Sequence, residues 1–480
     1  MGHVPAGPEL FHAQANAALK DPQLRQNFRG AMDYLQDKRK NAFVDPVEED
    51  KIRTLCESIR KRCLSKLPEL LEQLDANCTR NGIQVHWAQN DKEANNIIAN
   101  IAQSHKARTM IKGKSMVSEE IELNHEMAKL GIECLESDMG EYIVQLDGDK
   151  PSHIIMPAIH KNKQEVSDTF EKHLDDFTPT VDVDELIQTG RTRLRQKFHD
   201  ADIGLSGVNF AVAETGTLCL VENEGNGRMC TTVPKVHIAI TGIEKVVEFL
   251  SDVPPLYSAL TRSATGQAIT TYFNMISSPR KRGELDGPVE VHLVLLDNGR
   301  TQAYQDEEMR KTLQCIRCGA CMNHCPVYTR IGGHAYGTVY PGPIGKIISP
   351  HLMGLDNTKE LVTASSLCGA CGEVCPVRIP IPEMLQRLRT EAKNPPKPDA
   401  MPMKGQASAA STLESLAMKG FAFAATNPNL YHRGAWSATK LRGLVPNNMG
   451  PWTQCRTSPK LANKTLHQLI KARNKQAGDK

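Results

Sequence analysis

Four cysteines within eleven residues have the spacing in this chain that most clearly indicates chemistry. The segment "CIRCGACMNHCPVY" (315–328) follows the pattern C-x2-C-x2-C-x3-C-P. Three thiolates spaced in this way can surround one face of a cubane cluster, whereas the fourth, beyond a longer gap and turned by the proline, points to a different cluster. The segment therefore predicts iron–sulfur ligands at Cys315, Cys318, Cys321 and Cys325.

A second, thinner copy of the motif follows at 365–377, "SSLCGACGEVCPV". It contains Cys368, Cys371 and Cys375, and Ser365 stands where a full copy would have another cysteine. Zinc sites usually take four ligands as two separated pairs. Because both copies close with Cys-Pro and follow a triple-plus-one pattern, they favour iron–sulfur clusters over zinc.

Exchange of the last cysteine between the two copies predicts the ligands of two clusters. Cluster one takes Cys315, Cys318, Cys321 and Cys375, and cluster two takes Cys325, Cys368 and Cys371. Cluster one is then a 4Fe–4S cluster with a full thiolate set. Cluster two is either a 3Fe–4S cluster or a 4Fe–4S cluster whose last iron binds Ser365, water or another side chain. Such a pair moves single electrons and does not itself perform two-electron chemistry on a carbon substrate.

The composition suits a protein of several domains in a reducing compartment. The chain has 480 residues, of which 40% are hydrophobic and 24% charged. It has no apolar stretch near the ~20 residues that span a bilayer and no signal-peptide pattern, so a cytoplasmic location is expected. Clustered cysteines there indicate metal rather than disulfides. The other cysteines are expected to be buried and unreactive: Cys56, Cys63, Cys78, Cys134, Cys219, Cys230 and Cys455.

Positive charge is concentrated at the end of the chain. Residues 391–480 carry 14 Lys and Arg against 4 Asp and Glu, although the whole chain has a net charge of only +3. A basic tail on an acidic body suits docking to an acidic partner or peripheral contact with a membrane surface. A tail that is merely solvated explains the charges equally well, and no nucleic-acid partner is expected.

The surrounding sequence divides into four predicted parts. These are a helical region at 1–80, an α/β domain at 81–300, a ferredoxin-type iron–sulfur domain at 301–393, and a Pro-rich linker with the basic tail at 394–480. In the first part, Asp45 is the expected cap of a helix that has Pro46 at its first position.

Strand-like runs alternate with helical ones in the second part, which is typical of a largely parallel sheet. The expected strands are 83–87, 109–113, 132–136, 153–157, 210–214, 217–221, 236–240 and 289–296. The expected helices are 91–106, 118–131, 184–198 and 243–253. Between the two cysteine motifs, the Gly- and Pro-rich stretch 331–345 is expected to be an ordered loop.

Two turns of the α/β domain could bind an anion. Glu214 lies in "AETGT" (213–217), and Arg228 ends "NEGNGR" (223–228). A glycine-bearing loop with an arginine can hold a phosphate or carboxylate, and a glutamate at a strand end can act as nucleophile or base. The plainer interpretation, which we favour, is a pair of turns in which Glu214 makes a structural hydrogen bond.

A second candidate anion site precedes a helix. Lys112, Lys114 and Ser115 end an expected strand, and Ser118 is the expected cap of the helix that follows. A helix N-terminus attracts anions, but an ordinary cap explains the segment as well. The histidines show no metal-binding spacing with each other and are interpreted as surface or structural residues: His105, His125, His153, His160 and His237.

Several segments resemble the lactate utilization protein B family, which are iron–sulfur proteins of bacterial L-lactate oxidation. They are 110–146, 151–163, 207–229, 331–345 and the two cysteine motifs. The resemblance covers about residues 20 to 400 and is weaker in the tail. It implies a LUD domain, similar to the phosphosugar-isomerase and CoA-transferase fold, followed by an α-helical ferredoxin-type domain. It also implies two companion proteins, one cysteine-rich and one with a second LUD domain. Ser365 agrees with the family pattern.

The motifs and the resemblance together predict an electron-transfer subunit of an L-lactate-oxidising system, in which lactate becomes pyruvate. No G-x-G-x-x-G follows an expected strand, so the chain offers no flavin or nicotinamide fingerprint, and its catalytic residues and redox partner are not predicted. One alternative is that the α/β domain is itself catalytic on a carboxylate, phosphate or CoA-type substrate. Another is that this domain is an assembly surface for the companions.

Overall fold

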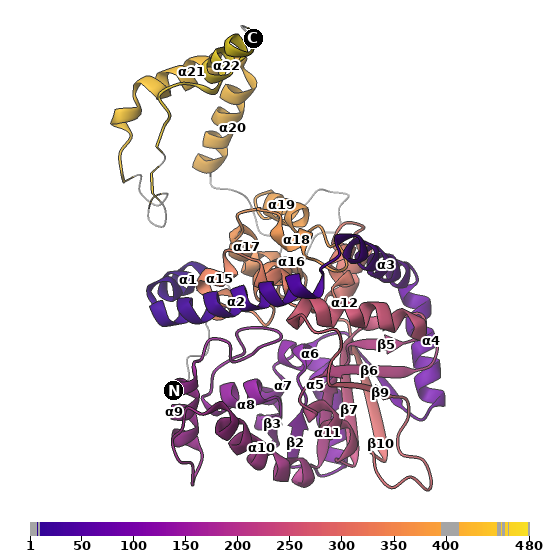
Figure 1. The fold of residues 1–480 in the computed structure, drawn as a ribbon. Coiled ribbons are helices and arrows are strands. Elements are labelled where there is room, and N and C mark those ends of the chain that lie inside the picture. Colours follow the sequence, from indigo (N-terminus) through magenta and orange to yellow (C-terminus); the bar gives the residue numbers. More distant parts are fainter. Residues whose placement is uncertain are drawn as a thin grey trace. The chain divides into compact units, whose positions relative to one another are not determined.

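The computed structural model describes residues 7, 10–394, 412–448, 453, 457–458 and 460–478. The chain divides into two compact units, Met1–Ser408 and Ala409–Lys480. Of the predicted Pro-rich linker, which opens the part at 394–480, residues 395–411 lie outside the described residues. The predicted boundaries within the first unit stay predictions. Figure 1 shows that the first unit has one part built on strands and another built of helices.

A sheet of six parallel strands forms the centre of the α/β domain. Its order is β1 (Gln84–Ala88), β10 (Glu290–Leu296), β7 (Val236–Gly242), β4 (Ile203–Gly207), β2 (Thr109–Lys112) and β3 (Glu133–Glu136). Strands β7 and β10 are mostly apolar and almost wholly buried, as expected of central parallel strands. The predicted α/β class with a largely parallel sheet is confirmed.

A second, smaller sheet has four strands in the order β8 (Val246–Val247), β5 (Phe210–Val212), β6 (Thr217–Glu222) and β9 (Tyr272–Ile276). Strands β5 and β6 form an antiparallel hairpin, whereas β5 and β8 are parallel. The predicted strands at 210–214 and 217–221 are this hairpin. Strands β4, β8 and β9 are absent from the predicted set; β4, "IGLSG", contains two glycines, which disfavour a strand outside its tertiary context.

The predicted strand at 153–157 is wrong. These residues form a series of bends between helices. The His153 Nδ1 atom accepts hydrogen bonds from the amides of Ile155 and Met156 at 3.0 and 3.1 Å. Because the imidazole satisfies these two amides, the backbone turns around the side chain and does not extend along a sheet.

The predicted helix at 243–253 is also wrong. Its residues form a 3-10 turn (Ile243–Lys245), strand β8 and a second 3-10 turn (Leu250–Asp252). The two β8 valines pair with β5. This pairing outweighs the local helical pattern, since β-branched residues readily adopt extended backbone.

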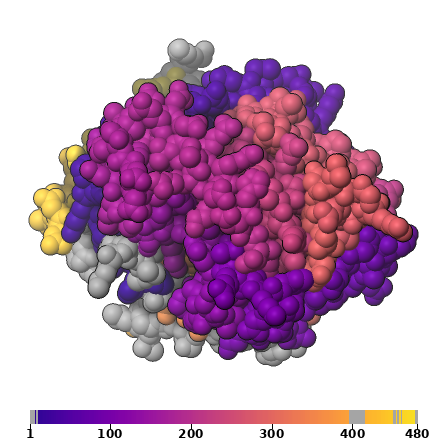
Figure 2. Space-filling model, turned by 90° about the horizontal axis from the view of Figure 1, so that it is seen from below, coloured from indigo at the N-terminus to yellow at the C-terminus, as the bar shows by residue number. Residues whose placement is uncertain are grey.

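Helices α5 to α12 accompany the two sheets. They are α5 (Asp91–Ser104), α6 (Met116–Glu120), α7 (Leu123–Lys129), α8 (Met139–Leu146), α9 (Lys163–His173), α10 (Val183–Asp200), α11 (Asn226–Thr232) and α12 (Val253–Thr265). The predicted helices at 91–106 and 184–198 correspond to α5 and α10, and the one at 118–131 is divided between α6 and α7. Figure 2 shows, from below, that magenta and salmon segments of this domain cover much of one face.

The cysteine-bearing part is helical. Its elements are α13 (Arg300–Gln305), α14 (Ala320–Asn323), α15 (Tyr328–Ile331), α16 (Gly342–Met353), α17 (Leu355–Thr363), α18 (Ala370–Glu373) and α19 (Ile381–Glu391). The stretch 331–345 is ordered, as predicted, but its last four residues already belong to α16. In the second unit, the described residues form α20 (Thr412–Thr426), α21 (Pro428–Lys440) and α22 (Leu466–Gly478). Among described residues, no helix is long and apolar enough to cross a membrane.

Four helices precede the sheet: α1 (Phe11–Lys20), α2 (Pro22–Ala42), α3 (Pro46–Ser65) and α4 (Leu67–Arg80). The predicted cap of α3 is confirmed, since the Asp45 carboxylate accepts a hydrogen bond from the Val47 amide at 2.8 Å. Helices α1 and α2 lie against α15, whereas α4 lies against β1 and β8. These helices therefore join the sheet to the cysteine-bearing part.

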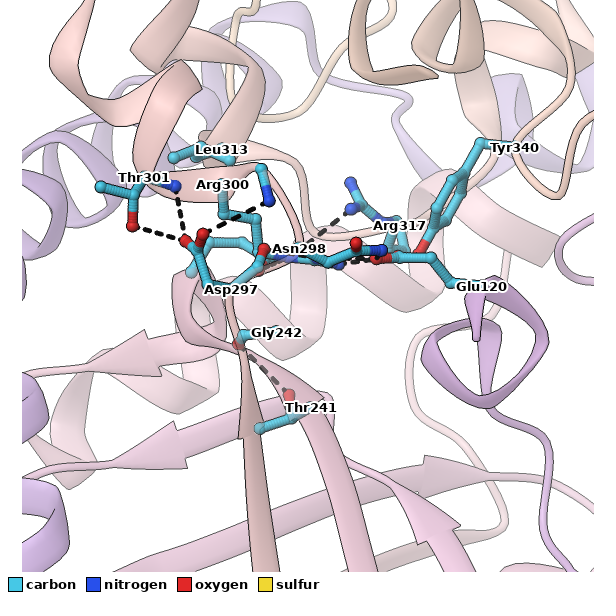
Figure 3. Close-up of polar contacts among 12 residues, drawn as sticks. Glu120, Thr241, Gly242, Asp297, Asn298, Arg300, Thr301, Leu313, Arg317 and Tyr340 are labelled. Atoms are coloured by element: carbon cyan, nitrogen blue, oxygen red, sulfur yellow. Dashed lines mark hydrogen bonds and ion pairs between the residues drawn. The ribbon is translucent and has the colours of Figure 1, made fainter. Parts of the chain in front are cut away.

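A network of buried charges connects the sheet to the first cysteine motif (Figure 3). The Arg300 guanidinium donates to both carboxylate oxygens of Glu120, at 2.7 and 2.8 Å, and to Glu244 at 2.6 Å. Arg317, inside the motif, donates to Glu244 at 3.3 Å and lies 4.7 Å from the ring centroid of Tyr340. The Tyr340 hydroxyl donates to Glu120 at 2.9 Å. The network thus fixes the motif against the carboxyl ends of β7 and β10.

Arg60 of α3 reinforces the same junction through the backbone. Its guanidinium is fully buried and donates to four carbonyl oxygens, those of Glu244, Val246, Leu313 and Gln314. Two of these carbonyls follow β7 and two immediately precede the cysteine motif. A buried arginine that satisfies four carbonyls holds three distant segments in one arrangement.

The Glu244 carboxylate accepts hydrogen bonds from both Arg300 and Arg317. Burial alone would raise the pKa of Glu244, but Arg300 and then Arg317 outweigh burial and lower the pKa to about 2. Since this pKa lies below the ordinary value of 4.5, ionised Glu244 stabilises the fold above about pH 4.5. This contribution is lost as the pH falls through that range towards 2.

We expect Glu244→Gln to lower the free energy of unfolding at pH 7 by roughly 3 kcal/mol, because it leaves Arg300 and Arg317 without their shared charge. The difference from wild type should shrink progressively as the pH falls from 5 towards 2, since wild-type Glu244 loses its stabilising effect over this range. Urea unfolding at three pH values measures it. Glu307→Gln, at an exposed glutamate, is the control, and a difference that is independent of pH would contradict the assignment.

Candidate iron–sulfur centre

The structure gathers the seven motif cysteines inside the helical part. Cys315 follows the 3-10 turn Met309–Gln314, Cys321 lies on α14, and Cys371 lies on α18. Six of the seven are buried, and Cys368 alone of them is exposed. None of the described cysteines forms a disulfide. The seven side chains are therefore free thiols in a largely water-excluded environment.

Burial and neighbouring thiols place the cysteines in two electrostatic groups. Burial raises the pKa of Cys318, and the nearby Cys375 and Cys315 thiols raise it further. Burial raises the pKa of Cys371 to about 11, with additional contributions from Cys325 and Cys368. The two groups are Cys315, Cys318, Cys321 and Cys375, and Cys325, Cys368 and Cys371. The two groups adjoin at Cys321, because Cys371 of the other group is among its electrostatic neighbours.

Backbone amides point at sulfur atoms in both motifs. The amide of Arg317 donates to the Cys315 Sγ atom at 3.4 Å, and that of Tyr328 donates to Cys325 Sγ at 3.5 Å. The Ile379 amide donates to Cys375 Sγ at 3.4 Å. Amide donors stabilise negative sulfur, and metal binding displaces thiol protons. Buried free thiols with such donors fit an iron–sulfur cluster.

A loop of the α/β domain closes over the first motif. The His153 Nε2 atom donates to the Asn323 side-chain oxygen at 2.9 Å, and the Tyr328 hydroxyl donates to the Ser152 carbonyl at 2.6 Å. Burial lowers the pKa of His153 to about 4, so the imidazole is neutral at pH 7. A side chain on Gly319 would place its Cβ atom 3.2 Å from Ile155. This loop therefore packs on the motif and excludes water from it.

Lys346 is a central residue that the sequence analysis does not single out. It lies on α16 with only 1% of its surface exposed. Its ammonium donates to the Ala364 carbonyl and lies 5.4 Å from the Tyr336 ring centroid. Cys325 and Cys371 are among its electrostatic neighbours. A single lysine inside the apolar run "GPIGKII" is the signal that could have identified it.

The side chains singled out in the two turns of the α/β domain both make contacts within the protein. The Glu214 carboxylate accepts a hydrogen bond from the Leu250 amide at 2.9 Å, which is the structural role that we favoured. The segment around it is the β5–β6 turn. The Arg228 guanidinium lies 5.8 Å from the ring centroid of Tyr272, and the residues around it begin α11.

The candidate site at Lys112 is not supported. Its buried ammonium donates to Glu136 at 2.6 Å, Glu119 at 3.0 Å and Asn124 at 2.8 Å, so internal partners occupy its donors. The predicted cap at Ser118 is wrong, because Ser115 caps α6 and its hydroxyl accepts from the Ser118 amide. The sequence places the cap one turn late.

Two histidine groups are brought together by the fold although their sequence spacing shows no metal pattern. They are His105, Glu290 and His292, and Asp149, His160 and His334, with ligand atoms within 4.8 Å of one another. In the second group, His160 bonds Asp149 at 3.0 Å and Ser152 at 2.8 Å. His334 bonds the Lys150 carbonyl, and His105 of the first group bonds Glu290 at 3.2 Å, so we interpret both groups as structural.

The scattered cysteines differ from the motif cysteines in their surroundings. Burial raises the pKa of Cys56, Cys78, Cys219 and Cys230 to about 12, so these thiols stay protonated and unreactive, as predicted. Cys455 lies outside the described residues.

Three family models match the chain. A LUD domain matches residues 71–296, a 4Fe-4S dicluster domain matches 311–379, and the C-terminal domain of lactate utilisation protein B matches 387–475. The last match covers most of the basic tail. The similarity therefore extends beyond residue 400, farther along the chain than the expected range of about 20 to 400.

Curated relatives match along almost the entire chain. Lactate utilization protein B of Bacillus subtilis is 41% identical over 463 residues, which are 94% of each chain. The protein of the same name from Shouchella clausii is 41% identical over 479 residues, which are 97% of each chain. Together with the domain matches, these similarities show that the chain belongs to the lactate utilization protein B family.

Proposed function

We propose that the chain is the iron–sulfur electron-transfer subunit of a system that oxidises L-lactate to pyruvate. The observation that carries this proposal is the gathering of seven free thiols in two adjacent groups within a dicluster domain. Loaded clusters at these thiols would supply one-electron transfer. The family's shared name, which concerns lactate utilization, indicates the substrate of the system.

We propose that each motif gives its last cysteine to the cluster of the other motif. Cys315, Cys318, Cys321 and Cys375 would hold cluster one, and Cys325, Cys368 and Cys371 would hold cluster two. The two electrostatic groups of thiols support this division, and the closeness of Cys321 to Cys371 supports a short path between clusters.

Exposure suggests how electrons leave the protein. Cys368 is exposed, whereas every proposed ligand of cluster one is buried. We propose that cluster two is the contact point with the next carrier and that cluster one is the internal relay. The α/β domain would bind the two companion proteins in the cytoplasm, with the basic tail as a further contact for an acidic partner or a membrane surface. The internal hydrogen bonds of Glu214 and Lys112 favour this function over a catalytic α/β domain.

The exchange of ligands makes a specific prediction for Cys375→Ala. The variant should lose about half of the iron and sulfide per chain, and its electron paramagnetic resonance spectrum should match that of Cys318→Ala. It should differ from Cys371→Ala, which removes a ligand of the other cluster. Anaerobic iron and sulfide analysis with spectroscopy measures this, and Cys219→Ala is the control. If Cys375→Ala instead matched Cys371→Ala, the motifs would not exchange ligands.

We expect the isolated chain to hold its clusters but not to oxidise lactate, since it offers no flavin or nicotinamide fingerprint. The measurement is dye reduction with L-lactate by the pure protein, then by the protein with its two companions. Dithionite reduction of the clusters in the same preparation is the control for loading. Lactate-dependent dye reduction by the pure chain would overturn the prediction.

Replacement of Lys346 by Met should lower the reduction potential of cluster two. A buried positive charge stabilises the reduced cluster, which carries one more negative charge than the oxidised one. Redox titration followed by electron paramagnetic resonance measures the shift. Lys359→Met, at an exposed lysine of α17, should leave the potential unchanged; equal potentials in wild type and Lys346→Met would show that the ammonium does not act on the cluster.

A further inference from the structure

We infer that the Ser365 side-chain oxygen is the fourth protein ligand of cluster two, which makes it a 4Fe–4S cluster with three thiolates and one oxygen. This inference rests on the proposed function and identifies one position of its site. The first observation that supports it is a constant sequence offset between the two motifs. Cys318, Cys321 and Cys325 are each followed, 50 positions later, by Cys368, Cys371 and Cys375, and the same offset leads from Cys315 to Ser365.

The backbone follows the same offset. Arg317 and Leu367 both adopt left-handed conformations, with φ of 62° and 55°. Gly319 and Gly369 follow with φ of 75° and 89°. A left-handed conformation is unusual for arginine and leucine, so its occurrence at equivalent positions shows that both loops have the same shape. Helices α14 and α18 then begin at equivalent residues, Ala320 and Ala370.

The side chains at the offset position make the same hydrogen bond. The Arg317 amide donates to the Cys315 Sγ atom at 3.4 Å, and the Leu367 amide donates to the Ser365 Oγ atom at 3.1 Å. The shorter distance is that expected for the smaller oxygen atom. The Ser365 oxygen therefore occupies, in its loop, the place that the Cys315 sulfur occupies in the other.

Two cations hold the backbone beside Ser365. The Arg389 guanidinium of α19 donates to the carbonyls of Ser365 at 2.8 Å and Val362 at 2.8 Å. The buried Lys346 ammonium donates to the Ala364 carbonyl. These contacts fix the main chain on both sides of Ser365, so its backbone position does not depend on the contacts of its hydroxyl.

Binding of iron by the Ser365 oxygen requires neither an oxidant nor a reductant. The Ser365 O–H bond breaks, an iron–oxygen bond forms, and the proton leaves to solvent. The Leu367 amide and the Lys346 charge both favour negative oxygen at this position. An oxygen is a harder ligand than sulfur and prefers the more oxidised iron. Cluster two should therefore have a lower reduction potential than the same cluster with four thiolates.

The test compares anaerobically purified wild type, Ser365→Ala, Ser365→Cys and the control Ser366→Ala, at the exposed neighbour. We expect Ser365→Ala to lose about one iron per chain and to show a three-iron signal when oxidised. Ser365→Cys should keep four irons in cluster two and raise its reduction potential. Ser366→Ala should match wild type in iron content, spectrum and potential.

Three outcomes would overturn the inference. Unchanged iron content and potential in Ser365→Ala would mean that water or another group holds the fourth iron. A three-iron signal in untreated wild type that Ser365→Cys converts to a four-iron one would mean that serine does not bind iron. An unchanged potential in Ser365→Cys would exclude an oxygen ligand. Failure of the proposed function has a different result, namely wild-type protein without two sets of iron and sulfide.

Discussion

Pairing of buried charge at the end of the parallel sheet is the constraint on which the rest of this structure depends. Glu244 and Arg300 are completely buried, and Arg317 is nearly so. Isolated charges at such positions would each cost several kcal/mol, so the arrangement is stable only when all partners are present. Since these partners come from the 3-10 turn that follows β7, from α13 and from the first cysteine motif, they hold the sheet and the motif in one relative position. The positions of the motif cysteines therefore depend on these buried ion pairs.

The sequence predicts the parts of this molecule whose structure is determined locally. The spacing of Cys315 to Cys325 and of Cys368 to Cys375 identifies the centre because a loop around a cluster needs ligands at short fixed intervals. The apolar runs that became β7 and β10 were recognisable because buried parallel strands are continuously hydrophobic. The Asp45 cap was recognisable because capping involves only neighbouring residues.

The errors and omissions concern residues whose conformation depends on distant partners. Residues 153–157 resemble a strand but turn around His153, which accepts from two nearby amides and is itself held by Asn323, 170 positions away. The segment 243–253 resembles a helix but pairs with β5. Lys112 resembles an anion-binding residue until the fold brings Glu136 to it. In each case, the deciding contact is one that no pattern in the local sequence encodes.

The N-terminal helices have a consequence for how the protein is made. Gln36 of α2 bonds the Asn323 carbonyl at a separation of 287 residues, and Arg53 of α3 bonds the Cys375 carbonyl at a separation of 322. A ribosome that adds about 5–20 residues each second therefore needs on the order of 15–60 s between synthesis of these helices and synthesis of their partners. During that interval, the buried ring of Phe28 lacks Tyr328, against which it packs in the finished fold. The packing of the first helices of the chain is therefore among the last to be completed, because it needs the segments that carry the cysteines.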